Sequence, residues 1–291
     1  MSRGILIRTF SHSKSAARRV HGAARTVFLS TVVVVSFFLN CGSTWSSKVV
    51  QGVFTASEEP DKQRLEKKLG GLAGRDKANQ KKSVMRYHLL TFPDAEPSVN
   101  FRLIFVHHPA GESAEHYLQN WQPAAVRNQT MLLVPQREGE YGVESPGLKT
   151  FADLIADIIV HYPVDRRRIY VAGASAGALI GTWLVQRDPS FWRGAIFVAG
   201  FGFEDSLVGV PIDEGKFKSY PRILYVHGWH DTETFKSVLD GIEMLLDRGV
   251  NVQLYDYENA GHEHRPEWNK RIFEWIQDIE RDDKPSVAPA A

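Results

Sequence analysis

The sequence contains a single cysteine, Cys41, so no disulfide can form within the chain. It also lacks an excess of charge of either sign, because 35 basic and 34 acidic residues leave a net charge of +1. This balance gives no indication of a nucleic acid or another polyanion as a partner. No apolar run reaches the roughly 17–25 residues of a comfortable bilayer span. What remains is 291 residues with 43% hydrophobic content, enough for one large domain or two small ones.

Residues 1–41 have the pattern of a targeting segment. Six Lys and Arg residues and no acidic residue precede the apolar run Val27–Leu39. A basic stretch ahead of about 7–15 apolar residues is typical of a secretory signal, although the Val and Phe content would also permit a buried strand. The pair Arg18-Arg19 is weakly similar to a twin-arginine signal. We therefore expect an exported protein, periplasmic or extracellular.

Cys41 follows the apolar run by two residues and resembles the acylation site of bacterial lipoproteins. In that pattern a leucine stands three residues before the cysteine and a small residue directly before it; here Phe38 and Asn40 stand there. Two expectations stay open. Either Cys41 is lipidated and anchors the N-terminus in a membrane, or it lies near an ordinary cleavage site.

Residues 42–83 are mostly polar, with charge clusters and few large apolar side chains, and predict a disordered tether. The folded domain is expected over residues 84–281, with a disordered tail at 282–291. Within the domain, apolar runs typical of strands alternate with segments of helical spacing such as 148–162. This alternation predicts an α/β fold with a mostly parallel central sheet and helices on both faces. In such sheets ligands bind beyond the carboxyl ends of the strands.

One motif combines a hydroxyl with two glycines at such a strand end. In Gly173-Ala174-Ser175-Ala176-Gly177, the serine follows the strand "RRIYVAG" and precedes a helix over 176–186. This is the context in which a G-x-S-x-G pattern indicates a nucleophile on a sharp turn. The glycines leave room for the neighbouring strand and helix, and the first amides of the helix point at the same spot. The alternative is a small-residue junction without chemistry.

A serine hydroxyl needs a base, and the base needs an orienting carboxylate. Asp231 follows the strand "RILYVHG", and His262 lies on the loop between the last strand and the final helix. Each has a competitor. Asp231 could instead cap the next helix, leaving Glu204 or Asp205 as the carboxylate. His264 could be the base, but Gly261 favours His262, because glycine can take backbone angles that suit a sharp turn.

The order G-x-S-x-G, H-G-x-x-D, G-H resembles the α/β-hydrolases over about residues 84–281, most closely esterases related to polyhydroxyalkanoate depolymerases and feruloyl esterases. The resemblance implies a serine esterase that works through an acyl-enzyme, with Ser175 as nucleophile, Asp231 as acid and His262 as base. It also implies an oxyanion hole built from the amide of Ala176 and a second amide on the loop "VHHPAGESAEHYLQNW". There His108 replaces the family's glycine and Pro109 has no N–H to donate, so His108, Ala110 or Gly111 could supply that donor.

The substrate is then a small-molecule or polymer-linked ester, and no cofactor is required. Only residues 202–221 could form a cap, and a cap this short would leave the site open. Four aromatic residues on expected loops could line a pocket or only pack: Trp121, Tyr141, Phe203 and Trp229. We expect no catalytic metal, since the H-E-x-x-H motif is missing. A peptidase of the same fold and an inactive binding protein remain the alternatives.

Overall fold

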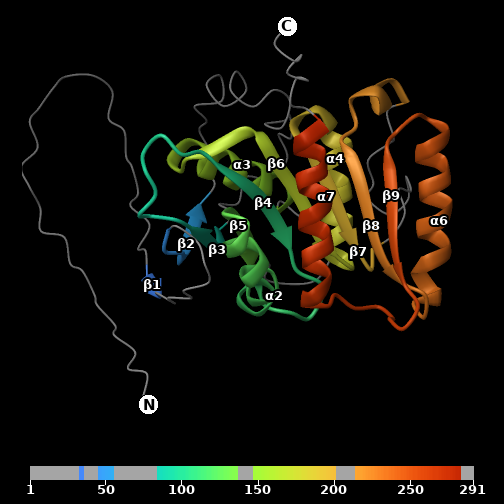
Figure 1. Ribbon diagram of the computed structural model, residues 1–291, viewed down its shortest axis with the longest axis horizontal. Coiled ribbons are helices and arrows are strands. Elements are labelled where there is room, and N and C mark those ends of the chain that lie inside the picture. Colours follow the sequence, from blue (N-terminus) through green and yellow to red (C-terminus); the bar gives the residue numbers. More distant parts are fainter. Residues whose placement is uncertain (1–32, 36–44, 56–83, 137–146, 201–213, 283–291) are drawn as a thin grey trace, which may run out of the picture.

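The computed structural model describes residues 33–35, 45–55, 84–136, 147–200 and 214–282. Within these ranges, nine strands form one sheet in the order β1-β2-β3-β5-β4-β6-β7-β8-β9 (Figure 1). The strands β4 to β9 pair in parallel, whereas β1, β2 and β3 pair antiparallel at one side. The predicted mostly parallel sheet is therefore confirmed. The parallel strands are β4 (Phe101–His107), β5 (Thr130–Gln136), β6 (Val164–Ala174), β7 (Gly194–Val198), β8 (Arg222–Gly228) and β9 (Val252–Tyr257).

Helices cover both faces of the sheet, as predicted (Figure 1). On one face lie α2 (Ala114–Arg127) and α7 (Asn269–Asp282), and on the other lie α3 (Gly147–His161), α4 (Ala176–Arg187) and α6 (Thr232–Asp247). Short 3-10 turns occur at η1 (Pro189–Phe191), η2 (Glu214–Ser219) and η3 (Pro266–Trp268). None of the described helices is long and apolar enough to cross a membrane.

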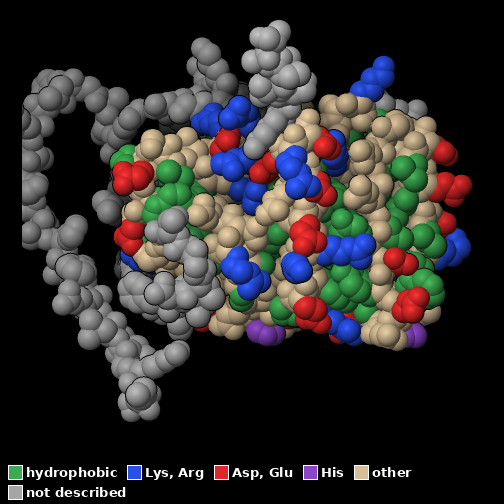
Figure 2. Space-filling view, viewed as in Figure 1, with side chains coloured by type: hydrophobic (Ala, Val, Ile, Leu, Met, Phe, Trp, Pro, Cys, Tyr) green, Lys and Arg blue, Asp and Glu red, His purple; other side chains and the backbone are tan. Residues whose placement is uncertain are grey.

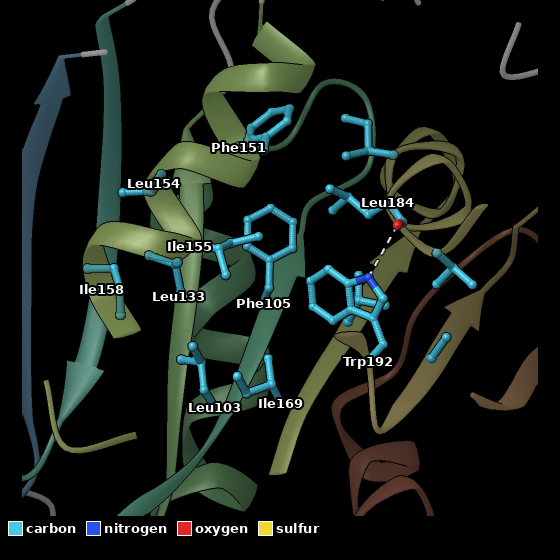
Figure 3. Close-up of a cluster of buried hydrophobic side chains, with 14 of the residues drawn as sticks. Leu103, Phe105, Leu133, Phe151, Leu154, Ile155, Ile158, Ile169, Leu184 and Trp192 are labelled. Atoms are coloured by element: carbon cyan, nitrogen blue, oxygen red, sulfur yellow. Dashed lines mark hydrogen bonds between the residues drawn. The ribbon is translucent and has the colours of Figure 1, made fainter. Parts of the chain in front are cut away.

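The central strands are buried on both faces, which explains why they read as continuous apolar runs. Along β4, Leu103 and Phe105 pack on the face of α3 and α4, while Ile104 and Val106 pack on the face of α2 and α7. All four side chains are fully buried. Figure 3 shows the first of these clusters, where the Trp192 indole N–H donates to the Leu184 carbonyl at 3.2 Å. The sheet is thus a rigid platform, and its strand ends are fixed relative to one another.

The sheet begins earlier in the chain than the sequence indicated. The strand β2 (Lys48–Thr55) lies inside the range 42–83 predicted as a tether, and it pairs along its whole length with β3 (Val84–Thr91). Its apolar residues Val49 and Val50 are buried, which gives the segment a reason to join the sheet. The strand β1 (Val33–Val35) comes from the predicted targeting segment and pairs with β2, which matches the alternative of a strand there. Export and lipidation stay predictions, since Cys41 lies outside the described residues.

A second difference concerns the segment after β4, which was expected to be a loop. Most of it forms α2, a helix whose first turn is capped by Ser113: the His116 N–H donates to the Ser113 hydroxyl at 3.2 Å. The helix contains Pro123, which signals a break when only the local sequence is considered. Only residues 108–113 remain as a connection between β4 and the helix. Residues 202–213 of the expected cap lie outside the described residues.

An ion pair ties α7 to the amino-terminal end of the sheet. The Arg102 guanidinium donates to both carboxylate oxygens of Glu280, at 2.8 and 2.6 Å, and to the Thr130 hydroxyl at 2.9 Å. The Tyr170 hydroxyl also donates to Glu280, at 3.2 Å. The Arg102 side chain is only 6% exposed. Figure 2 shows charged side chains of both signs interspersed over the face of the molecule in view. The Arg102–Glu280 pair, with Thr130 and Tyr170, joins α7 to the three strands β4, β5 and β6.

We predict that Glu280→Ala lowers the free energy of unfolding by about 3 kcal/mol, because it leaves the buried Arg102 charge without its partner. Urea denaturation measures the change. The matched control is Asp278→Ala on the same helix, whose carboxylate is 55% exposed and pairs only with Arg281. We expect less than about 0.5 kcal/mol for the control, because solvent screens exposed pairs. Equal losses in the two variants would contradict the role assigned to Glu280.

Candidate active site

Ser175 occupies a strained turn between β6 and α4. Its backbone angles are φ 51° and ψ −121°, a region that side-chain-bearing residues rarely enter and that costs on the order of 1–3 kcal/mol. The turn is held in place because the Ser175 N–H donates to the Val198 carbonyl of β7 at 3.0 Å. Its carbonyl accepts from the Ala178 N–H in the first turn of α4 at 2.9 Å. Such strain persists only where the surrounding structure fixes it, and it marks Ser175 as a candidate functional residue.

The two flanking glycines allow this turn to pack against its neighbours. A Cβ atom on Gly173 would lie 2.2 Å from the carbonyl oxygen of Gly177. A Cβ atom on Gly177 would lie 2.3 Å from the carbonyl oxygen of His107, at the end of β4. Both contacts are with backbone atoms, which cannot rotate away as a side chain could. The G-x-S-x-G spacing is thus required by packing, as the sequence analysis argued.

Asp231 follows β8 at the start of α6, but its side chain does not cap that helix. Its Oδ2 atom instead accepts hydrogen bonds from Thr234 Oγ1 at 2.6 Å and from His262 Nδ1 at 2.7 Å. The side chain is 4% exposed. The alternative of a simple helix cap therefore does not apply. The reserve carboxylates Glu204 and Asp205 lie outside the described residues.

His262 connects the aspartate to the serine. Its Nδ1 atom lies 2.7 Å from Asp231 Oδ2, and its Nε2 atom lies 2.7 Å from Ser175 Oγ. A neutral ring that donates Nδ1–H to the carboxylate presents its Nε2 lone pair to the hydroxyl. The imidazole is 43% exposed, so solvent and small molecules can reach it. The structure thus brings together all three residues that the sequence analysis selected, from the ends of β6, β8 and β9.

The environment keeps the aspartate ionised. Burial alone would raise the pKa of Asp231, but hydrogen bonds from Thr234 and His262, followed by the charges of His262 and His227, hold that pKa below its ordinary value. An ionised carboxylate accepts hydrogen bonds and donates none. It therefore fixes the tautomer of His262 in which the proton sits on Nδ1.

His264, the competitor for the base, is half-buried, packs against α2 and does not contact Ser175. Its Nε2–H donates to Asn269 Oδ1 at 2.9 Å, and its ring lies against Tyr117 and Trp121, with centroid distances of 5.5 and 5.3 Å. Burial lowers the pKa of His264 to about 4. At neutral pH this ring is an uncharged part of the core below the His262 loop. It therefore supports that loop and does not act as the base.

The argument from Gly261 is wrong, although the histidine that it favoured is the one at Ser175. Only Gly111 and Gly249 among the described glycines have a positive φ. A Cβ atom on Gly261 would have nothing within 4 Å. The loop is held instead by hydrogen bonds of its neighbours, such as the His230 N–H to the Ala260 carbonyl at 2.9 Å. No special backbone conformation of glycine is needed there.

The loop after β4 lies directly against the Ser175 turn, where a second oxyanion donor was expected. The carbonyl oxygens of His107 and His108 lie 2.3 and 2.8 Å from the Cβ position of Gly177. Both histidine rings are buried and stack on each other, with centroids 4.9 Å apart. His108 Nδ1 lies 2.8 Å from the Pro109 carbonyl oxygen. The backbone of His108 and the first amide of α4, that of Ala176, thus belong to adjacent segments.

Of the four aromatic candidates for a pocket, the two in the described ranges have different environments. Trp121 is fully buried in α2, where it packs on Phe273 and His264, so it serves the core. Trp229 is 48% exposed, and its indole N–H donates to Asp256 Oδ2 at 2.8 Å. Tyr141 and Phe203 lie outside the described residues. Within the described ranges, no three His, Cys, Asp or Glu side chains are grouped so that they could hold a metal ion.

The sequence analysis missed two residues that contact the aspartate. Thr234 lies one turn into α6, and His227 lies near the end of β8, with its Nε2 atom 3.1 Å from Asp231 Oδ2. The sequence does contain an indication for His227, since it is the first residue of the H-G-x-x-D pattern. Thr234 gave no such signal, because its contact depends on where α6 begins.

We predict that Gly177→Ala destabilises the protein by about 1–3 kcal/mol, because the new methyl group meets the His107 carbonyl and forces the backbone to shift. The matched control is Gly261→Ala, beside His262, which should change the free energy of unfolding by less than about 0.5 kcal/mol. Urea denaturation of both variants measures this. A tolerated Gly177→Ala would mean that the turn and β4 are not in close contact.

We also predict a pH-dependent loss of stability from His264. The unfolded chain protonates this residue near pH 6.5, whereas the folded chain keeps it neutral until about pH 4. The contribution of the neutral His264 ring to the free energy of unfolding is therefore fully present above pH 6.5. It falls as the pH drops from 6.5 to about 4, by up to about 3 kcal/mol. The difference in urea midpoint between wild type and His264→Gln should shrink from pH 7 to pH 4. The control His116→Gln, at a 63% exposed ring, should run parallel to wild type.

Comparison with known proteins gives matches of structure only. No family model matches the sequence, and no curated protein matches it. A ferulic acid esterase matches with a TM-score of 0.56 and 15% identity over 81% of this chain and 98% of its own. S-formylglutathione hydrolase from Staphylococcus aureus matches with a TM-score of 0.54 and 12% identity, over 79% of this chain and 98% of its own. Acetyl xylan esterase from Paenibacillus sp. R4 matches with a TM-score of 0.56 and 12% identity, over 86% of this chain and 88% of its own. The chain therefore has the α/β-hydrolase fold, as its motifs implied.

Proposed function

We propose that this chain is a serine hydrolase that cleaves carboxylic esters through an acyl-enzyme intermediate. The observation that carries the proposal is the continuous hydrogen-bonded row from Ser175 Oγ through His262 to Asp231 Oδ2, with both distances at 2.7 Å. Nucleophile, base and orienting carboxylate in this geometry are the requirements of serine catalysis. The esterases among the structural matches support the same reaction class.

In the first half of the reaction, Ser175 Oγ attacks the ester carbonyl while His262 Nε2 takes the hydroxyl proton. The resulting imidazolium is stabilised by the Asp231 carboxylate, which is itself shielded from water. The negative charge on the carbonyl oxygen is placed at the start of α4, where the Ala176 N–H and the helix dipole favour an anion. A second N–H from the loop after β4, which begins at His108, completes the oxyanion hole.

The first half ends when the first tetrahedral intermediate collapses: the proton on His262 Nε2 passes to the departing alcohol, and the acyl group remains on Ser175. Water then enters, and His262 removes a proton from it as it attacks the acyl carbonyl. The 43% exposure of His262 is compatible with this entry. In this second half, the bond between the acyl carbon and Ser175 Oγ then breaks, His262 Nε2 returns its proton to Ser175 Oγ, and the free acid leaves, so no cofactor is consumed.

We propose a small-molecule or polymer-linked carboxylic ester as the substrate. Two of the similar structures are a ferulic acid esterase and an acetyl xylan esterase. Both names refer to short or aromatic acyl groups, and such groups are the first to test. Aryl and alkyl esters of graded acyl length, together with feruloyl and acetyl esters, make up the panel.

We predict that Ser175→Ala lowers kcat/KM for the best ester of this panel by roughly 10⁴-fold or more, because the nucleophile is lost. A fluorophosphonate probe should label wild type at Ser175 and leave the variant unlabelled. The control is Ser190→Ala, an exposed serine outside the site whose hydroxyl donates to Asp188 Oδ1 at 2.8 Å. It should keep its activity within about 2-fold.

Three results would count against the proposal. Hydrolysis that survives in Ser175→Ala would show that another group carries the reaction. A wild-type protein that cleaves matched peptide amides faster than esters would make it a peptidase of this fold. Binding of esters without turnover, together with no labelling by the probe, would indicate an inactive binding protein.

A further inference from the structure

The Asp231 carboxylate is held by more than its bond to His262. Three donors meet at one oxygen, Oδ2: His262 Nδ1 at 2.7 Å, Thr234 Oγ1 at 2.6 Å and His227 Nε2 at 3.1 Å. Thr234 Oγ1 also lies 3.1 Å from His227 Nε2. The three donors come from the loop after β9, from α6 and from β8. Figure 1 shows these three elements next to one another. The carboxylate is thus contacted from three elements of the fold.

His227 is the buried member of this group. Its side chain is 0% exposed, and its ring stacks on Phe235 of α6, with centroids 5.3 Å apart. Its Nδ1 atom has no hydrogen-bond partner within the part of the chain that the structure describes. A proton on Nδ1 would therefore be a buried donor without an acceptor, whereas a proton on Nε2 has two acceptors. The ring is thus neutral with its proton on Nε2, and burial keeps the pKa of His227 below its ordinary value despite the charge of Asp231.

The hydroxyl of Thr234 fits between the other two groups. Its single proton goes to Asp231 Oδ2, the shorter of its two contacts. Its oxygen lone pair is then left to accept from His227 Nε2–H, which is shared between Thr234 and Asp231. Each proton of this small network has an acceptor, and all three side chains are buried. The arrangement is specific because apolar replacements of similar shape would fill the space but leave the carboxylate with one donor.

We propose that His227 and Thr234 are positioning residues that clamp the Asp231 carboxylate and thereby set the basicity of His262. The catalytic consequence rests on the proposed function, whereas the clamp itself does not. Among the described residues, the titratable groups that face Asp231 are His227 from β8 and His262 from the loop after β9; Thr234 and Phe235 from α6 are uncharged. The pH behaviour of His262 therefore depends on a short list of neighbours.

The sign of the effect follows from how the carboxylate shares its charge. Three donors divide the electron density of one oxygen, so the removal of one strengthens the hydrogen bond to the other two. A stronger interaction between Asp231 and His262 stabilises the imidazolium, which raises the pH at which His262 loses its proton. The carboxylate also gains freedom to rotate, so the ring is oriented correctly for a smaller fraction of the time and kcat falls.

Two substitutions of His227 separate the donor from the packing. His227→Phe keeps a ring against Phe235 but removes the donor, whereas His227→Gln keeps an N–H close to the position of Nε2 but removes the ring. We expect His227→Phe to lose about 10-fold in kcat with KM unchanged, and its acid limb of kcat/KM to move to higher pH. His227→Gln should keep kcat within about 3-fold and leave the limb in place. The reverse order would show that His227 only packs, and would overturn the proposal.

Thr234 provides an independent pair if His227→Phe does not fold. Thr234→Val has nearly the same shape without the donor, and Thr234→Ser restores the hydroxyl. We expect the acid limb of the pH profile of kcat/KM to move to higher pH in Thr234→Val, as in His227→Phe. Thr234→Ser should give the wild-type pH profile. If valine and serine give the same profile as wild type, the hydroxyl does not position Asp231.

A measurement without substrate distinguishes this inference from the proposed function. Titration of the His262 ring by NMR in histidine-labelled protein reports its protonation directly. If the titration moves in His227→Phe and Thr234→Val while the wild type hydrolyses no ester, the proposed function fails and the clamp stands. If wild type is active but the His262 titration is the same in every variant, the clamp is wrong and the proposed function stands.

Discussion

The structure depends on one close backbone contact, that between Gly177 of α4 and the end of β4. With no side chain on Gly177, the helix approaches the His107 carbonyl so closely that even a methyl group would have no room. This contact presses the first turn of α4 onto the edge of the sheet and leaves Ser175 no ordinary backbone conformation. The strain at Ser175 is offset by the packing of β6 and β7 on both faces, where the side chains are almost entirely removed from water. Once the serine is fixed in this way, every other part of the candidate site has to be placed relative to it.

The parallel order of the strands performs that placement. Ser175, Asp231 and His262 follow β6, β8 and β9, whose carboxyl ends lie at one edge of the sheet. His262 is 87 residues from Ser175 and 31 from Asp231 in sequence, yet it contacts both. Adjacent strands are roughly 4.8 Å apart, so β6 and β8 are separated by about 10 Å, a gap that an imidazole and two short side chains can span. The row of hydrogen bonds is therefore a consequence of the topology together with the choice of three loops.

Much of this could be predicted from the sequence, for reasons that are local. Buried parallel strands are apolar on both faces, so β4, β6 and β8 can be recognised in the sequence as continuous apolar runs. The glycines around Ser175 can be recognised too, because any chain with this turn needs close backbone contacts at those two positions. The missed elements depend on distant partners. The strand β2 is recognisable only through its pairing with β3, because polar residues follow it, and α2 is concealed by Pro123 although its Tyr117 and Trp121 are buried. In the sequence, Gly261 favours His262 over His264. In the structure the two histidines differ because His264 packs under α2, and no local pattern reveals that packing.

These two histidines show how position alone divides one residue type into two chemical roles. His264 is enclosed by aromatic rings and an amide, an environment that penalises a positive charge and keeps the ring neutral. His262, two residues earlier, has a carboxylate on one side, a hydroxyl on the other and solvent around its exposed part. A base that must gain and lose a proton within each turnover needs this second environment, because the charged form must be stabilised without being trapped. The first environment suits a fixed support, and the ring under the loop holds the reactive one at the serine.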